Sequence, residues 1–289
     1  MKVAIVGGAG KMGKWIAHFL VNEEFQVSLI DTDTDKLDAA MRELNVKGTN
    51  VLGSASAADF VIISVPIAVF ESTVNELGGF LMKGQTVIDV TSVKTMPVET
   101  MHRQFTNCLV LGAHPVFGPG ATAVKGHNIV FTPTTGPETA LAEQARSFLE
   151  KKGARVELMT PAEHDRLMAV VLGLAHYIAI VSGDTLLGLD NLAGMEMVSG
   201  VTFRVLMTMV SSVLGEDPSL YASIQTHLPE LPNLQRSFIE KASEWGELVQ
   251  QKNSGELTAR MTALTQKLAL IAPETGTAYK EMYNIAKNH

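Results

Sequence analysis

The first 31 residues hold the pattern that most constrains the fold. A short apolar run, Lys2–Val6, leads into the glycine-rich turn Gly7–Gly13 and then into a helix-like stretch. A second apolar run, Gln26–Ile30, follows and ends at the carboxylate of Asp31. A dinucleotide-binding βαβ unit needs these parts in this order, whereas a glycine turn alone also joins ordinary elements. The complete series therefore predicts a Rossmann-type fold that binds a dinucleotide.

The residues of the turn have separate predicted roles. Gly8 permits the tight turn, Gly10 lets backbone approach the pyrophosphate, and Gly13 lets the new helix pack close to the strand. Lys11 and Met12 open the helix, whose N–H groups and positive dipole end face the phosphates. These five residues form the predicted pyrophosphate-binding segment.

The acidic end of the second strand predicts the type of dinucleotide. Asp31 follows Gly13 by eighteen residues, where a carboxylate can accept hydrogen bonds from ribose hydroxyls. A carboxylate there repels a 2′-phosphate, and no arginine occurs in residues 32–35. We therefore expect NAD rather than NADP.

Composition narrows the compartment and the partners. The 289 residues are 46% hydrophobic and 18% charged, which is enough for a sizeable core and suggests two domains. The net charge of −7, without a basic run, disfavours nucleic acid and anionic membranes. A single cysteine, Cys108, and a first strand with no leader-like segment before it predict a cytoplasmic protein. The most apolar stretch, Met168–Val181, is shorter than a membrane span and contains His176.

Strand and helix signals alternate through residues 1–160. Several strands are continuous apolar runs, as in a sheet covered on both faces, so we expect a doubly wound, mostly parallel sheet in this domain. Thr95 is a predicted helix cap and Gly153 a helix stop. The predicted strands are Val3–Val6, Val27–Ile30, Phe60–Val65, Thr86–Val90, Leu109–Ala113, Ile129–Thr132 and Arg155–Leu158. The predicted helices are Met12–Asn22, Thr34–Leu44, Phe70–Gly78, Met96–Phe105 and Pro137–Lys152.

Strand signals disappear after residue 160, so residues 161–289 are predicted to form an all-helical domain. The segment Met195–Leu214 is apolar around most of its circumference and must be covered on nearly every side. This favours a homodimer interface, and the alternative is a central helix of the domain. The predicted helices are Glu163–Leu187, Met195–Leu214, Pro218–Gln225, Leu231–Lys252 and Gly255–Pro273.

Ligands of doubly wound sheets bind at the carboxyl ends of the strands, and two predicted strand ends suit the cofactor. Ser64, Val65 and Pro66 end one strand, where backbone and the proline ring can line a ribose. Thr91 follows the next strand and is also predicted to lie at the cofactor. These four residues complete the predicted cofactor set.

The remaining polar residues at strand ends predict catalysis. His114 is followed by two prolines and two glycines, which hold it in a rigid loop. Histidine titrates near neutral pH and can take a proton from a substrate hydroxyl while hydride leaves the same carbon. Ser92 and Lys94 supply a hydroxyl and an ammonium on the neighbouring strand end. The alternatives are a turn residue for His114 and a helix-capping hydroxyl for Ser92.

Three polar residues interrupt the helical half. His176 and Arg204 lie in apolar helices, where an imidazole or guanidinium needs a partner. Each is either a ligand of the substrate or a core residue, with Glu196 a possible internal partner of Arg204. His164 lacks metal-ligand spacing, so we expect no metal site and a structural role at a helix start.

Seven segments in the correct order resemble the prephenate/arogenate dehydrogenase family, most closely its archaeal-type members. The loop H-P-V-F-G-P and the helix G-L-A-H-Y are the more specific of them. The segments are G-G-A-G-K-M-G-K-W at 7–15, S-V-P-I at 64–67, D-V-T-S-V-K at 89–94, H-P-V-F-G-P at 114–119, E-H-D-R at 163–166, G-L-A-H-Y at 173–177 and D-P-S-L-Y-A-S-I-Q at 217–225.

The resemblance implies an NAD-dependent oxidative decarboxylation of prephenate to 4-hydroxyphenylpyruvate, a step of tyrosine biosynthesis. His114 then corresponds to the catalytic histidine, and Ser92 to the serine that holds the C4 hydroxyl. Lys94 is expected near the substrate or cofactor, and His176 is expected to face the pocket. The family's second domain is helical and dimerises.

Two positions depart from the family pattern and bear on the substrate. Ser212 stands where members usually carry an arginine that binds a substrate carboxylate, and Ala68 stands where asparagine is common. Arg204 is the residue that can take over the carboxylate. Prephenate, arogenate, an amino-substituted prephenate and another hydroxy acid remain open as substrates, and a non-catalytic dinucleotide-binding regulator remains the alternative from another class.

Overall fold

The computed structural model describes residues 1–272 and 275–287. It divides into two compact units, which are called here the sheet unit and the helical unit. The sheet unit comprises residues 1–168 and 226–228, and the helical unit comprises the rest of the described chain. The first helix after residue 160 therefore belongs by its contacts to the sheet unit.

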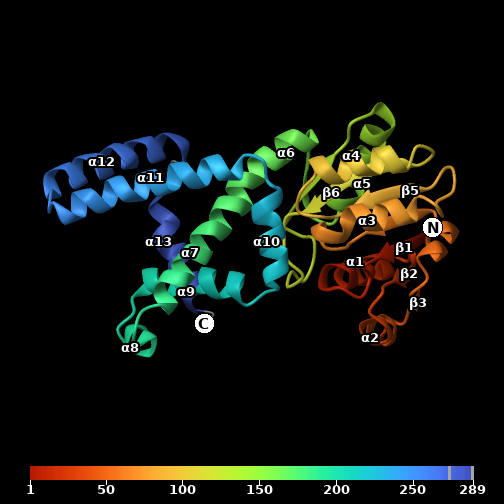
Figure 1. Ribbon diagram of the computed structural model, residues 1–289, viewed down its shortest axis with the longest axis horizontal. Helices are drawn as coiled ribbons and strands as arrows, with labels where there is room; N and C mark the ends of the chain where they lie inside the picture. Colours follow the sequence, from red (N-terminus) through yellow and green to blue (C-terminus); the bar gives the residue numbers. More distant parts are fainter. Residues whose placement is uncertain (273–274, 288–289) are drawn as a thin grey trace. The chain divides into compact units, whose positions relative to one another are not determined.

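The sheet unit is built on one eight-stranded sheet in the order β3-β2-β1-β4-β5-β6-β7-β8 (Figure 1). All neighbouring pairs are parallel except β6 and β7, which are antiparallel. The predicted doubly wound, mostly parallel sheet is confirmed. The strands are β1 (Lys2–Val6), β2 (Gln26–Ile30), β3 (Lys47–Thr49), β4 (Phe60–Ile63), β5 (Thr86–Asp89), β6 (Leu109–Pro115), β7 (Asn128–Thr132) and β8 (Arg155–Leu158).

Helices cover both faces of this sheet because strand side chains alternate between the faces. Val3 and Ile5 of β1 pack with α1 and α2, whereas Ala4 and Val6 pack with α3 and α4. Farther along the sheet, Leu111 of β6 packs with α5 on the α1 side. The helices of this unit are α1 (Lys11–Asn22), α2 (Thr34–Leu44), the 3-10 turn η1 (Leu52–Ala57), α3 (Ile67–Leu77), α4 (Thr95–Gln104), α5 (Gly136–Glu150) and α6 (Pro161–Met168).

Strand β6 is longer than the sequence predicted. It continues past Ala113 through His114 to Pro115, because antiparallel pairing with β7 joins Pro115 to Ile129. His114 therefore lies within a strand and not in the loop that follows it. By alternation with Leu111, its side chain falls on the face that α4 covers.

Other boundaries of the sheet unit also differ. Strands β4 and β5 end two residues and one residue earlier than predicted, and α3 begins directly after Pro66. The short edge strand β3 was not predicted, because three residues with a central glycine, Gly48, carry no apolar signal. The predicted stop Gly153 has a φ of +84°, three residues after α5 ends.

A continuous helical run passes from α6 through a π-helical turn into α7. This run, Pro161–Leu187, is longer than the apolar stretch weighed from sequence, and by length and composition it can cross a membrane. One such helix is weak evidence of a span, since a core helix of a soluble protein meets the same test. The elements after α6 are the π-turn η2 (Ala169–Leu174), α7 (Ala175–Leu187), α8 (Leu192–Met197), α9 (Val201–Leu214), α10 (Pro218–His227), α11 (Leu231–Gln250), α12 (Ser254–Ile271), the 3-10 turn η3 (Thr275–Thr277) and α13 (Ala278–Lys287).

The prediction of one helix over Met195–Leu214 was wrong. Residues 198–200 separate α8 from α9, and Gly200 is the N-cap of α9 with an extended backbone. Helix α9 packs against α7 and α13 and buries Val210 and Val213, as the alternative of a central helix expects. Helix α13 was not predicted, and the predicted end of the preceding helix at Pro273 lies outside the described residues.

Candidate active site

The glycine turn between β1 and α1 is too crowded for side chains at three positions. A Cβ at Gly8 would lie 2.8 Å from the carbonyl oxygen of Ile5. A Cβ at Gly13 would lie 2.3 Å from the carbonyl oxygen of Gly7. A Cβ at Gly7, whose φ is +77°, would lie 2.4 Å from the carbonyl oxygen of Ser64. A Cβ at Gly10 would meet only the Gly7 oxygen, at 3.3 Å. Gly10 therefore leaves bare backbone at the entrance of the turn, as close approach of a phosphate requires.

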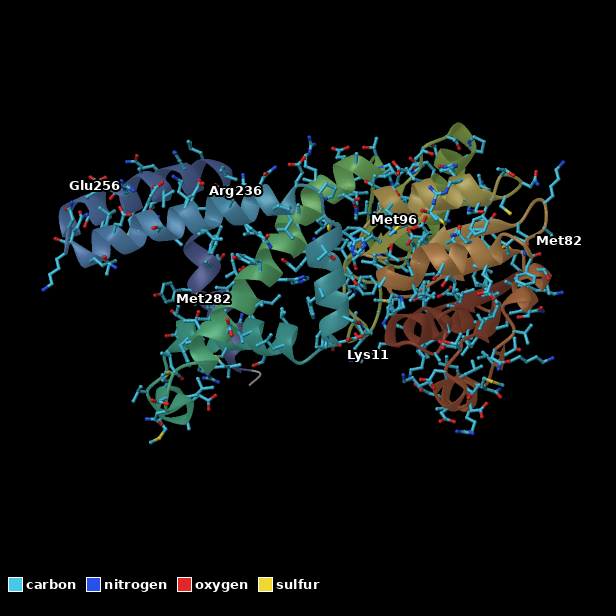
Figure 2. The ribbon with its side chains drawn as sticks, in the orientation of Figure 1. Lys11, Met82, Met96, Arg236, Glu256 and Met282 are labelled. Atoms are coloured by element: carbon cyan, nitrogen blue, oxygen red, sulfur yellow. The ribbon has the colours of Figure 1, made fainter. Side chains whose placement is uncertain are left out.

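The N-terminus of α1 is open toward this turn. Gly10 is its N-cap and, as a glycine, supplies no side-chain cap. Lys11 is exposed at the first helical position (Figure 2), and Met12 behind it is half-buried. A helix start without a side-chain cap offers its N–H groups and dipole to an anion.

Asp31 closes the turn from the end of β2. Its Oδ2 accepts a hydrogen bond from the Ala9 amide at 2.9 Å, and its Oδ1 accepts one from the Asp33 amide at 3.0 Å. Each carboxylate oxygen keeps a further acceptor site, so ribose hydroxyls can still donate to it. The bond to Ala9 was not foreseen, and it means that Asp31 also fixes the glycine turn.

The end of β4 lies beside the same turn. The Ser64 amide donates to the Val6 carbonyl at 2.8 Å, and the Ser64 carbonyl is the atom that limits Gly7. Ser64 and Val65 are half-buried, and Pro66 is exposed as the N-cap of α3. A dinucleotide needs backbone N–H donors for its phosphates and a carboxylate acceptor for its ribose hydroxyls. The bare glycine backbone, the helix N-terminus and Asp31 supply these groups, so these residues fit that cofactor.

Lys94 has a different place from the one predicted. The sequence predicts a substrate-binding ammonium, but its side chain is fully buried and Nζ donates to Asp89 Oδ2 and, at 2.6 Å, to the Ala113 carbonyl. Burial lowers the pKa of Lys94 and raises that of Asp89, and the attraction between the two groups opposes both shifts. Lys94 therefore braces the strand that carries His114 and does not reach a ligand directly.

Gly112 and Thr91 complete the surroundings of this pair. A Cβ at Gly112 would lie 2.3 Å from Thr132 Oγ1, 2.7 Å from Val98 Cγ2 and 3.2 Å from Lys94 Cδ, so the glycine makes room for all three side chains. The Thr91 hydroxyl donates to Asp89 Oδ1 at 2.6 Å and is buried, an interior role in place of the predicted cofactor contact. Ser92, the next residue, is half-buried in the loop before α4.

His114 is buried and hydrogen-bonded to a second histidine. Its Nδ1 lies 2.8 Å from Nε2 of His164, which is the fourth residue of α6. The two rings meet edge to face, with centroids 5.0 Å apart. On its other side, His164 Nδ1 lies 2.8 Å from Oδ1 of Asp165. Three consecutive polar groups thus form one buried chain inside the sheet unit.

Asp165 also caps helix α4. Its Oδ1 accepts from the Lys94 amide at 2.7 Å, and its Oδ2 accepts from the Thr95 amide at 2.8 Å. The N-cap residue of α4 is Lys94, with no side-chain cap of its own, so the predicted local cap at Thr95 was wrong. A carboxylate from 70 residues away supplies the cap instead.

The environment fixes the protonation of this chain. Burial alone would raise the pKa of Asp165, but hydrogen bonds from His164 and from the amides of Thr95 and Lys94 outweigh it and lower that pKa. Burial lowers the pKa of His164, against the opposing pull of Asp165. Burial, then the neighbouring His164 and Lys94, hold the pKa of His114 well below 6.5. Asp165 is therefore ionised and both imidazoles are neutral near neutral pH.

The acceptor at the end of the chain follows from these states. A carboxylate only accepts, so His164 Nδ1 carries a proton and its Nε2 is an acceptor. His114 must then donate from Nδ1, which leaves the lone pair of its Nε2 free. His114 can therefore take a proton at Nε2.

Sequence reasoning missed His164 and Asp165 as parts of this site. It treated His164 as a residue of a helix start, because neither spacing nor composition connects it to His114. The available signal was the E-H-D-R segment at 163–166, which places an imidazole and a carboxylate side by side in the first helix after the sheet.

The predicted residues of the helical unit lie on α7 and α9. His176 is half-buried, and its ring meets Tyr221 edge to face at 4.8 Å. Its Nδ1 is buried and has no hydrogen-bond partner among the described residues, and burial lowers the pKa of the ring. A buried orphan acceptor or donor favours the reading of His176 as a ligand residue over a satisfied core histidine. Arg204 is exposed on α9.

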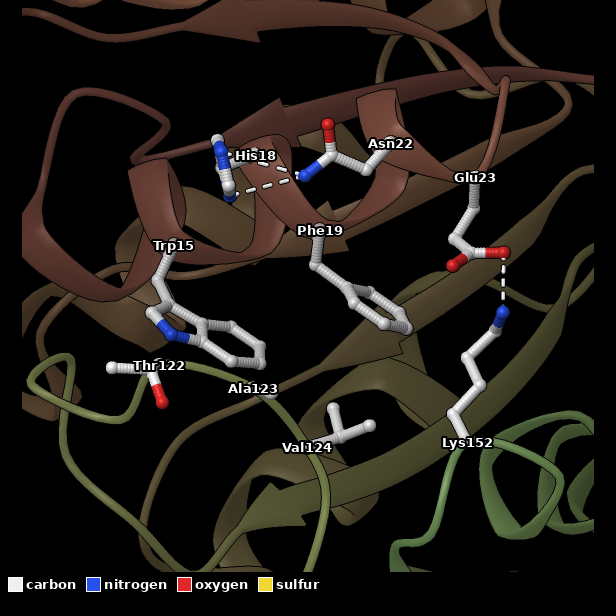
Figure 3. Close-up of a pocket in the computed structure, with 9 residues that line it drawn as sticks. All are labelled: Trp15, His18, Phe19, Asn22, Glu23, Thr122, Ala123, Val124 and Lys152. Carbon is white, nitrogen blue, oxygen red and sulfur yellow. Dashed lines mark hydrogen bonds and ion pairs between the residues drawn. The ribbon is translucent and has the colours of Figure 1, made fainter.

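One surface hollow, of about 250 Å³, lies on the sheet unit away from these groups (Figure 3). Trp15 and Phe19 of α1 face Val124 across it, and the ion pair between Glu23 and Lys152, at 2.5 Å, borders one side. None of the predicted site residues lines it. In the described parts of the chain, no group of three His, Cys, Asp or Glu side chains is arranged to hold a metal ion.

Comparison with known proteins assigns both parts of the chain. Residues 16–158 match the nucleotide-binding domain of prephenate dehydrogenase, and residues 160–263 match its dimerization domain. The crystal structure of Aquifex aeolicus prephenate dehydrogenase with hydroxyphenyl propionate and NAD+ has the same fold, with a TM-score of 0.76 at 23% identity over 94% of this chain and 98% of that chain.

Two curated relatives differ in the substrate that their names state. A "Probable arogenate/prephenate dehydrogenase" of Methanocaldococcus jannaschii is 31% identical over 88% of this chain, and the chain spans 58% of that relative's length. A 4-amino-4-deoxyprephenate dehydrogenase of Streptomyces pristinaespiralis is 24% identical, and the match covers 91% of this chain and 90% of that protein's length. Two family domains in the same order, over nearly the whole sheet and most of the helical half, decide the family although not the substrate. The chain belongs to the prephenate dehydrogenase family.

Proposed function

We propose that this chain catalyses the NAD-dependent oxidative decarboxylation of prephenate or a close analogue of it. The observation that carries the proposal is the free Nε2 lone pair of His114, at the carboxyl end of β6 in a family of dehydrogenases. Such a base can remove the proton of a ring hydroxyl. With prephenate, the product is 4-hydroxyphenylpyruvate, a precursor of tyrosine.

The cofactor, when bound, accepts the hydride that leaves C4 of the cyclohexadienol ring. His114 Nε2 takes the proton of the hydroxyl on that carbon, the ring carboxylate departs as CO2 while the ring becomes aromatic, and the proton then returns to the ring oxygen. Ser92 holds the C4 hydroxyl beside His114, which keeps the proton and its acceptor within hydrogen-bond reach. Lys94 supports the site indirectly: its hydrogen bonds to Asp89 and to the Ala113 carbonyl hold strand β6 in place.

NAD is held by the turn described above. The backbone at Gly8, Gly10 and Gly13 and the start of α1 at Lys11 and Met12 bind the pyrophosphate. Asp31 accepts hydrogen bonds from the ribose hydroxyls, and Ser64, Val65 and Pro66 line the cofactor from the end of β4. The negative charge of Asp31 selects NAD over NADP.

The substrate contacts of the helical unit are His176 and Arg204. His176 offers its unpartnered Nδ1, and Arg204 offers a guanidinium for a substrate carboxylate in place of the residue at Ser212. Prephenate, arogenate and 4-amino-4-deoxyprephenate are the candidate substrates. The names of the relatives support all three as candidates.

NADH formation with these three substrates, each with NAD, tests the proposal. Turnover of prephenate or arogenate establishes the proposed reaction with Ser212 in place. Turnover of the amino analogue alone changes the substrate and keeps the reaction. If NAD binds and none of the three is oxidised, the proposal fails and a dinucleotide-binding regulator becomes the better account.

We also propose that the chain is a cytoplasmic homodimer that pairs through its helical unit. An apolar stripe on α12 is at least half exposed, and its members recur at intervals of three and four residues. This spacing is typical of a helix face that packs on another helix. The stripe consists of Met261, Leu264, Leu268 and Ile271.

A further inference from the structure

The buried chain Asp165–His164–His114 does more than hold the catalytic ring. We propose that His164 is a proton-relay and positioning residue: it fixes the tautomer of His114 and takes up the proton that His114 releases from Nδ1 during the reaction. The proposal rests on the proposed function, because it assigns His164 and Asp165 roles in the same proton transfer.

The first step of the argument is the fixed direction of the chain. Asp165 receives three donors: the amides of Lys94 and Thr95 at 2.7 and 2.8 Å, and Nδ1 of His164 at 2.8 Å. A carboxylate with these donors stays ionised and cannot donate. His164 therefore presents a lone pair at Nε2, 2.8 Å from Nδ1 of His114. Only the Nδ1–H tautomer of His114 satisfies this contact.

The second step is that the chain is satisfied in both proton states. When His114 Nε2 accepts the proton of the substrate hydroxyl, its Nδ1 proton passes to His164 Nε2. His164 then has protons on both nitrogens and carries the positive charge, and His114 is neutral with its proton on Nε2. The reverse transfer then lets His114 Nε2 return its proton to the phenolate oxygen of the product, which gives the product hydroxyl and restores the first state. No hydrogen bond of the chain is lost in either direction.

The third step is where the positive charge is best placed. The charged groups that face His114 are Lys94 from α4, Asp89 from β5, and His164 and Asp165 from α6. The Asp89 charge is taken up by Lys94, whose ammonium lies under the same strand. His164 is hydrogen-bonded directly to the Asp165 carboxylate, whereas His114 is connected to it only through His164. Burial disfavours a cation on either ring, but only His164 has the Asp165 carboxylate opposing that effect, so the cation is better stabilised on His164.

A purely structural role does not account for this geometry. Capping of α4 needs only the Asp165 carboxylate, and it does not require a histidine at position 164. His164 is fully buried, and its two ring nitrogens form hydrogen bonds with Asp165 and His114. A buried imidazole that joins a carboxylate to a base is the arrangement in which a relay is built.

Two substitutions separate positioning from relay. In His164→Gln, the amide NH2 can donate to Asp165 and the amide oxygen can accept from His114 Nδ1, so the tautomer is kept but no proton can be taken up. In His164→Leu, both functions are lost. His127→Asn is the matched control, because His127 packs on Phe117 in the same unit and touches no member of the chain.

Steady-state kinetics with the substrate that the wild-type chain oxidises give the first test. We expect His164→Gln to keep KM within about twofold and to lose at least about tenfold in kcat, and His164→Leu to lose at least about 100-fold. His127→Asn should match the wild type. Wild-type kcat in His164→Gln would overturn the relay, and wild-type kcat in both variants would overturn the positioning as well.

Long-range ¹H–¹⁵N correlation spectra of the full wild-type chain give a test that needs no turnover. His114 and His164 should both appear as neutral Nδ1–H tautomers, and His114 should keep this tautomer in His164→Gln. A neutral Nε2–H tautomer for His114 in the wild type would contradict the proposal. If no substrate is oxidised, the proposed function fails, while the spectra still decide the direction of the chain.

Discussion

Oδ2 of Asp165 lies 2.8 Å from the backbone nitrogen of Thr95, and this contact joins the start of α6 to the start of α4. The same carboxylate receives His164, so one side chain both caps a helix and polarises the histidine pair. This arrangement explains why α6 belongs by its contacts to the sheet unit although it follows the last strand. The face of the sheet that carries His114 is therefore covered in part by a helix that the sequence assigned to the second domain.

Asp165→Asn is expected to destabilise the chain by about 1–3 kcal/mol and to lower kcat. The amide NH2 would oppose an N–H donor that the carboxylate now satisfies, in a buried place. Urea unfolding monitored by circular dichroism measures the loss. Asp33→Asn is the control, since Asp33 caps α2 through the Lys36 amide at an exposed site where asparagine serves nearly as well. Equal, small effects of the two substitutions would contradict the remote cap.

Gly10→Ala is expected to fold normally and to weaken NAD binding by at least about tenfold. Its backbone conformation suits any residue, and the new Cβ meets only the Gly7 oxygen at 3.3 Å, but it would occupy the approach to the pyrophosphate. Titration calorimetry with NAD measures the affinity. Gly246→Ala, at an open position of α11, should leave the affinity unchanged. Unchanged NAD affinity in Gly10→Ala would place the cofactor elsewhere.

The acid limb of the kcat/KM profile is expected below pH 6.5. The pKa of His114 lies well below that value because of burial and of the neighbouring His164 and Lys94. A base works when neutral, so activity is present above this pKa and is lost as the pH falls through it. Stability follows the same sign, because the unfolded chain binds protons on these histidines first. A limb at or above pH 6.5 would contradict a buried, neutral His114.

Leu264→Glu combined with Leu268→Glu is expected to convert the dimer into a monomer. Two carboxylates would have to be buried in the apolar stripe of α12, and the free energy of removing them from water exceeds the free energy gained from the apolar contact. Size-exclusion chromatography with light scattering gives the mass. Gln266→Glu, two residues from each leucine and on the opposite side of the helix, should remain dimeric. A monomeric wild type would contradict the proposed pairing directly.

Local signals were sufficient for much of the fold and of the cofactor turn. The series from β1 to Asp31 lies within the first 31 residues, and contacts that leave no room for a Cβ explain Gly7, Gly8 and Gly13. Strands buried on both faces show as apolar runs of four or five residues, so their positions along the chain could be predicted. Polar residues at strand ends indicated His114 and Ser92, and the family resemblance then gave each of them a role.

The remainder depended on contacts between distant residues. Antiparallel pairing with β7 extends β6 to Pro115, and the residues near His114 in the sequence give no signal of this pairing. The cap of α4 comes from Asp165, so a search for a neighbouring Thr or Ser finds the wrong residue. Lys94 looked like a ligand residue because sequence cannot show that Asp89 and the Ala113 carbonyl claim its ammonium. The division between α8 and α9 rests on the backbone at Gly200, which apolar periodicity does not register.

The most direct test of the central claim is NADH formation by His114→Asn, with NAD affinity measured on the same preparation. Asparagine keeps a polar group next to His164 but offers no basic lone pair at the position of Nε2. We predict a loss of at least about 100-fold in kcat, an NAD affinity within about twofold of wild type, and wild-type kinetics for His127→Asn. Retention of activity in His114→Asn would show that another group accepts the proton and would contradict this account.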